Sequence, residues 1–138
     1  MPTDCRGDIT YTDTAVTTLV IMLVLAMSLN IFSFFTLKQD LEYCCEQLVE
    51  EAACEGRTDG NFTVRFSQLC TELGFDEADI TCSFDGTAFR EGSSKVQYGD
   101  TIMITLVYHT SVCGTGIFDI PASVSVSSSG ISEKYWKS

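Results

Sequence analysis

The sequence predicts an α+β protein with a long N-terminal helix, a second short helix and a small antiparallel sheet of three to four strands. Three observations support this fold class. Residues 14 to 37 contain no charged side chain, apolar residues keep a helical spacing beyond that run, and the last third of the chain alternates apolar and polar residues. We expect one folded head carried by the helix.

The uncharged run predicts a transmembrane helix over residues 14–37, preceded by a short polar leader at 1–13. At about 1.5 Å per residue the run reaches roughly 36 Å, enough to span a hydrocarbon core of about 30 Å. A cleaved secretory signal is the alternative, because the small residues Ala26 and Ser28 flank Met27 as at a cleavage site. The acidic leader and the continuation of the run to Leu37 favour retention.

An amphipathic continuation of the same helix is predicted over residues 38–56. Apolar residues recur there at spacings of three and four, and Gly56 is the first strong stop. The helix should therefore run from about Asp13 to Glu55. Its apolar stripe consists of Leu41, Cys44, Cys45, Leu48 and Ala52, and glutamates occupy the opposite side at 42, 46, 50 and 51.

The extracytoplasmic head is expected to occupy residues 57–138 and to begin with a second helix. Phe62, Phe66 and Leu69 share one face of that helix, with Asn61 as the candidate N-cap and Gly74 as the stop. Strands follow, and a tight turn is expected at Asp85-Gly86. The inward-facing strand residues are predicted to be Ile80, Cys82, Phe84, Ile102, Ile104, Leu106, Tyr108, Ile120, Ala122, Val124 and Val126. Pro121 suits the start of an edge strand.

The charge balance excludes several classes of function. The net charge is −11, and no basic cluster is present, which argues against nucleic-acid binding. The chain has one histidine, His109, expected on the outer face of its strand, and lacks CxxC and phosphate-binding motifs. We therefore expect that the protein is not an enzyme and that it has no catalytic residue, no metal ligand and no cofactor.

The cysteines indicate an oxidising compartment. Six of the seven follow the apolar run, in the acidic head. On helical geometry Cys44 and Cys45 flank the apolar stripe and Cys54 points away from it. The candidate disulfide cysteines are Cys44, Cys45, Cys70, Cys82 and Cys113, and Cys54 is left as an uncertain thiol. The alternative is that all six are reduced, since free cysteine packs well in cores.

The order of these segments resembles pilins and pseudopilins of the type IV class. The similarity rests on the leader ending in Arg6-Gly7, the apolar helix with its amphipathic continuation, and the sparse sheet. The stretches "VQYGDTIMITLVY" and "FDIPASVSVSSSGISEKYW" are similar to the closing strands of TadE-like pilus-assembly proteins and of a related uncharacterised Firmicutes membrane family.

The resemblance implies a structural subunit of a type IV or Tad-like pilus, secretion or conjugation apparatus. It implies leader processing between Gly7 and Asp8, although the fifth residue after that point is Thr12 rather than Glu. Asp13 is then either the assembly charge or a marker of the membrane surface. Packing between helices would use Leu19, Met22, Ala26, Leu29 and Asn30.

The expected partners are membrane lipid and other copies of the chain or related pilin-like subunits. The expected location is the cell membrane, in a single pass, with an extracellular filament after assembly. A single-pass binding or sensor protein with an acidic extracytoplasmic head is the alternative.

Overall fold

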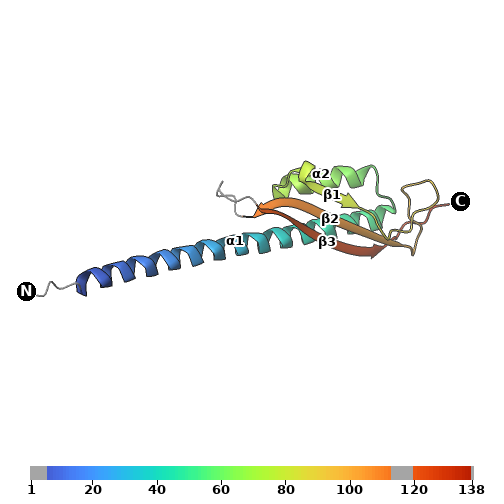
Figure 1. Ribbon diagram of the computed structural model, residues 1–138. Coiled ribbons are helices and arrows are strands. Elements are labelled where there is room, and N and C mark those ends of the chain that lie inside the picture. The colour runs from blue at the N-terminus through green and yellow to red at the C-terminus, as the bar shows by residue number, and fades with distance from the viewer. Residues whose placement is uncertain (1–5, 113–119, 138) are drawn as a thin grey trace, which may run out of the picture. The chain divides into compact units, whose positions relative to one another are not determined.

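The computed structural model describes residues 6–112 and 120–137, and the chain divides into two units between Phe35 and Thr36. The elements in chain order are α1 (Arg6–Glu55), α2 (Asn61–Leu73), a 3₁₀ turn η1 (Glu77–Asp79), β1 (Ile80–Ser83), β2 (Thr101–Val112) and β3 (Ile120–Ile131). The fold is α+β with a three-stranded antiparallel sheet, as the sequence predicts (Figure 1).

The first unit contains the N-terminal part of α1, which is helical throughout its described residues. Its sequence contains no proline or glycine between Asp8 and Phe35 that would interrupt the helix. No residue from 10 to 33 is buried. The side chains in this range thus lie at the surface of the described chain.

The second unit is the head, in which residues 36–55 of α1 cover one face of the sheet. The sheet order is β1-β2-β3, and Leu106 pairs with Cys82 on one side and with Val126 on the other. α2 lies on the same face, where Phe62 contacts the ring of Phe84. The core is made of Leu41, Cys44, Cys45, Leu48, Val49, Ala52, Phe62, Leu69, Cys70, Ile80, Val96, Ile102, Ile104, Leu106, Val124 and Val126.

Local signals explain where the helices end. Gly56 has a φ of 64° and follows the last residue of α1, and Gly74 caps α2 in the left-handed conformation with a φ of 75°. The tight turn at Asp85-Gly86 is also present, with the N–H of Thr87 donating to the carbonyl of Phe84 at 3.0 Å. These three sequence predictions are confirmed.

Three expectations about local structure are wrong. α1 begins at Arg6 rather than near Asp13, since no proline interrupts the intervening residues. Gly60, with a φ of 66°, is the N-cap of α2, and Asn61 instead donates its side-chain amide to the carboxylate of Glu55. Ile120 is 60% exposed, because the buried part of β3 begins only at Val124.

Candidate functional site

The N-terminal part of α1 is an apolar surface. One helix among the described residues, spanning Thr10–Glu55, is long and apolar enough to cross a membrane, and its most apolar window has no buried residue. Large side chains along it are mostly solvent-exposed in the chain by itself, including Leu19, Met22, Leu29 and Phe32. An apolar surface of this extent is compatible with a transmembrane anchor.

The polar residues of this segment are bonded within the helix. The hydroxyls of Thr14, Thr17, Thr18 and Ser28 donate to the carbonyl four residues earlier at 2.7–2.8 Å. The amide of Asn30 donates to the carbonyl of Ala26 at 2.9 Å. In lipid a polar group needs such a partner, because no water is available. At these positions one donor of each polar side chain is therefore satisfied inside the helix.

The residues predicted for helix packing lie on this surface. Leu19, Met22, Ala26, Leu29 and Asn30 are all exposed, and the bond of Asn30 to Ala26 lies within the helix rather than across to another chain.

The predicted processing and charge positions belong to the same helix. Gly7 and Asp8 lie in the first turn of α1, and the carboxylate of Asp13 is exposed. The structure therefore collects these residues on one element and leaves their roles as predictions.

The head contains a cluster of buried thiols. Cys44 and Cys45 come from α1, Cys70 from α2 and Cys82 from β1. Cys44, Cys45 and Cys70 are at most 1% exposed, whereas Cys54 is exposed, which agrees with the helical-face argument. The sulfur of Cys45 donates to the carbonyl of Ile104 at 3.3 Å.

The clustered cysteines are free thiols with raised pKa values. Burial, followed by the charges of Cys70, Cys45 and Cys82, raises the pKa of Cys44 to about 12. Burial raises the pKa of Cys45, Cys70 and Cys82 to about 11 each. Because these pKa values lie far above neutral, thiolate chemistry is suppressed near neutral pH.

The disulfide prediction gains no support from the structure. Cys44, Cys45, Cys54, Cys70 and Cys82 are all free, and Cys113 lies outside the described residues. No group of three or more His, Cys, Asp or Glu residues able to hold a metal ion occurs within residues 6–112 and 120–137. The described thiols therefore have two possible states: reduced side chains packed in the core, or disulfide cross-links.

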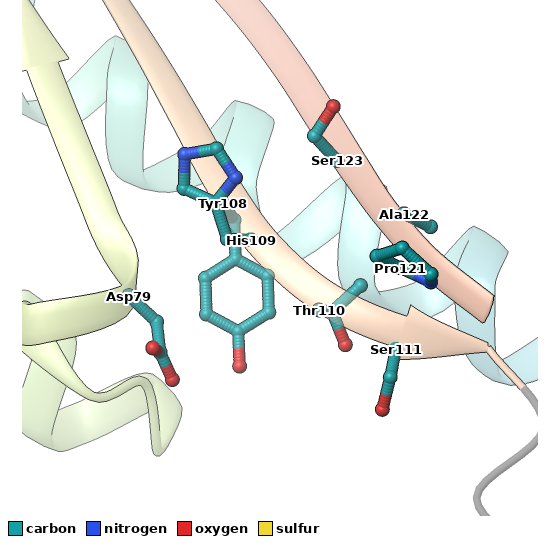
Figure 2. Close-up of a pocket in the computed structure, with 8 residues that line it drawn as sticks. All are labelled: Asp79, Tyr108, His109, Thr110, Ser111, Pro121, Ala122 and Ser123. Carbon is teal, nitrogen blue, oxygen red and sulfur yellow. The ribbon is translucent and has the colours of Figure 1, made fainter. Parts of the chain in front are cut away.

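A shallow hollow lies at the far end of β2 and β3 (Figure 2). Tyr108 and His109 leave β2 in different directions there, and Asp79 stands at the side of Tyr108. His109 is exposed on the face opposite Ile104 and Leu106, as predicted. The hollow combines one imidazole, one carboxylate and one phenol with uncharged Thr, Ser, Pro and Ala side chains.

The sequence did not predict the contacts that join the C-terminal tail to the end of α1, which we call the clasp. The indole N–H of Trp136 donates to the carbonyl of Gly56 at 3.1 Å, and Gln97 exchanges two bonds with the backbone of Trp136. The ammonium of Lys95 lies 4.4 Å from the indole centroid. The only tryptophan of the chain was the available signal, since its large apolar ring rarely stays without a packing partner.

Comparison with known families gives one match. Residues 18–137 match the family model described as domain of unknown function DUF4320. No curated protein and no solved structure matches the chain.

Proposed function

The chain belongs to the DUF4320 family, and on the chemistry of its own residues we propose that it is a membrane-anchored structural subunit of a pilin-like or TadE-like assembly. The observation that supports the proposal is that the two parts of α1 differ in burial. One part of this helix is apolar and unburied, and the other supplies the core lid of a small acidic head. Subunits of this kind assemble through the apolar part and expose the head.

Association through the apolar part would depend on packing. In lipid, apolar side chains gain little from leaving solvent, so close contact between helices must supply the free energy. Ala26 lies among Leu19, Met22 and Leu29 at helical spacing and offers a small residue against which a neighbouring helix can approach. Ser28 and one N–H of the Asn30 amide already bond within the helix, so they place few polar demands on a neighbouring helix.

A matched pair of substitutions tests the assembly role. Ala26→Trp enlarges a residue on the proposed packing face, and Val24→Trp makes a comparable change on the opposite face of the helix. Both variants keep the segment apolar and should enter the membrane fraction equally. We expect Ala26→Trp alone to abolish the chain from sheared extracellular filaments.

The opposite results distinguish the alternatives. Wild-type chain that stays in the membrane fraction and never appears in sheared material favours a membrane-anchored binding protein. Equal filament levels for the two variants would refute packing through the face of Ala26.

Processing of the leader is a separate part of the proposal. Cleavage between Gly7 and Asp8 would place a new amine in the first turn of α1, close in sequence to Asp13. Intact mass of the mature chain decides between this cut, a cut after Ser28 and none. A cut after Ser28 would remove most of the apolar segment and exclude the anchor.

The oxidation state of the head completes the proposal. If the head is extracytoplasmic, we propose that Cys44 and Cys45 form cross-links to Cys70 and Cys82. The first two lie on the buried face of α1, and the other two come from α2 and β1. Each bond forms by exchange with an external disulfide, which takes up the two electrons and two protons of the thiol pair. Peptide mapping under non-reducing conditions reads the pairs directly.

A further inference from the structure

The outer edge of β3 is long and unpaired in the described structure. β3 is the last strand of the sheet order, and it contains twelve residues, as many as β2. Figure 1 shows β3 in red-orange at the margin of the sheet. An exposed strand edge is a template for a further strand, and proteins usually protect it.

The register tells which residues present their backbone to this edge. In an antiparallel ladder alternate residues point toward the neighbouring strand. The N–H of Ser132 donates to the carbonyl of Asp100 at 2.9 Å, and the pairing continues without a shift from Ile102↔Gly130 to Val112↔Ile120. Even-numbered residues of β3 therefore face β2. The residues whose N–H and C=O groups face outward are Ser123, Ser125, Ser127, Ser129 and Ile131.

Pro121 falls in the same outward phase, so its missing N–H removes no bond from the ladder. The usual protections are otherwise missing along this strand. β1, β2 and β3 contain no Asp, Glu, Lys or Arg, in a chain with a net charge of −11. The outward-phase side chains between Pro121 and Ile131 are exposed serines, small enough to let another backbone approach. The edge is open over most of its length.

Carboxylates of α1 line the inner side of this edge. A Cβ on Gly130 would lie 2.7 Å from Val49 and 3.9 Å from the Cβ of Ala53, which places that side of α1 beneath β3. At 100° per residue Glu42 and Glu46 lie on the same side of the helix as Val49 and Ala53. Both glutamates are exposed, and Glu42 pairs with Lys38 at 3.5 Å, so Glu46 is the main carboxylate offered to a partner. A strand added beside β3 would carry alternate side chains toward them.

We propose that the free edge of β3 accepts an extended segment of a partner protein as a fourth strand, with Lys or Arg at the positions that face α1. Main-chain hydrogen bonds to the outward-facing serines supply the binding, and the glutamates select basic residues at alternate positions. A second copy of this chain fits poorly, because pairing β3 with β3 would bring two rows of glutamates together. The inference concerns the head alone and holds whether or not the chain forms filaments.

The test uses the full-length chain in nanodiscs and a fluorescent nine-residue peptide of alternating Thr and Lys. Control peptides alternate Thr and Glu, or carry N-methyl groups on the residues that would bond β3. We expect each control to bind at least tenfold more weakly than the Thr–Lys peptide, with empty nanodiscs as the blank. Equal binding of the N-methylated peptide would reduce the interaction to charge attraction and overturn the proposal.

Two variants locate the site. Ser127→Pro removes an outward N–H without removing a ladder bond and should weaken the Thr–Lys peptide at least tenfold, whereas Ser127→Ala should not. Glu46→Lys leaves the backbone intact and should shift the preference toward the Thr–Glu peptide, which keeps the test informative if Ser127→Pro misfolds. If Glu46→Lys leaves the preference for the Thr–Lys peptide unchanged, the proposal that the added strand directs Lys or Arg toward α1 is overturned. Dimers that form without peptide and disappear in Ser127→Pro would assign the edge to a second copy instead.

Discussion

The two parts of α1 share one helix and differ in what surrounds their apolar residues. Leu19 is 65% exposed and Leu48 is fully buried, although both are leucines at helical spacing in regular helix. Acidic residues accompany the second part and are missing between Thr14 and Leu37. Apolar residues at helical spacing therefore do not show by themselves whether a helix has an apolar surface all round or packs one face on a head. The residues on the other face of the helix show it.

The largest expected effect comes from removing the second part of α1. A chain that starts at Gln39 keeps Leu41, Leu48 and Ala52 and should fold, whereas one that starts at Gly60 loses them and exposes the inner face of the sheet. Each fully buried leucine contributes about 1.5–3 kcal/mol, a large share of a small domain's stability. Cooperative melting followed by circular dichroism should therefore be present in the first chain only. Cooperative melting of both would show that the sheet needs no lid.

A matched leucine pair sharpens the comparison within the full chain. Leu48→Ala should lower the free energy of unfolding of the head by about 2–5 kcal/mol, because it leaves a cavity in a packed core. Leu19→Ala should leave it unchanged within about 0.5 kcal/mol, since that side chain is exposed. Urea unfolding in mild detergent, followed by the fluorescence of Trp136, measures both. A similar loss in the two variants would contradict the division of α1 at Phe35.

The end of α1 offers a smaller, local test of the clasp. Gly56→Ala forces a φ of 64° on alanine and places its Cβ 2.5 Å from the Cβ of Lys134. Gly74→Ala imposes a similar φ of 75° with no atom within 4 Å, and therefore isolates the backbone strain of about 1 kcal/mol. We expect Gly56→Ala to cost about 1–2 kcal/mol more than Gly74→Ala. Equal costs would mean that the tail moves aside freely.

The sequence was sufficient for the features that depend on nearest neighbours. The helical period placed Cys44, Cys45 and Leu48 in the core and Cys54 outside it, and glycine identified the ends of both helices at Gly56 and Gly74. Strand alternation placed Ile102, Ile104 and Leu106 inward. These predictions succeed because each relies on a local periodicity or on a backbone angle that favours one residue type.

Features that depend on distant contacts were not accessible in the same way. The bond of Trp136 to Gly56 joins residues 80 positions apart, and no spacing rule relates them. Gly60 is the N-cap of α2 because the φ of 66° there suits glycine, and the side chain of Asn61 bonds to Glu55 instead. The exposure of Ile120 depends on where the buried part of β3 begins. The roles of Gly7, Asp8 and Asp13 remain predictions from the resemblance.

The smallest effect concerns the thiol cluster and separates its two states. Burial raises the pKa of Cys44 from 9.0 to about 12 and that of Cys70 to about 11. A thiol whose folded pKa exceeds its unfolded value stabilises the fold fully below the unfolded value, and this contribution is lost as the pH rises through the folded value. The reduced head should therefore keep its stability up to about pH 9 and lose it progressively as the pH rises toward the raised pKa values of the buried thiols.

The pH test has an internal control. Cys44→Ala should flatten the alkaline loss in the reduced chain, whereas Cys54→Ala should change it little, because Cys54 is exposed. An oxidised head with both proposed cross-links has no titrating thiol in the cluster and should show no such loss attributable to it. Unfolding curves in urea at pH 8, 9, 10 and 11, with and without reductant, measure the slope. A slope that is the same in Cys44→Ala as in the reduced parent would mean that the Cys44 thiol stays accessible to water, against its burial in the head core.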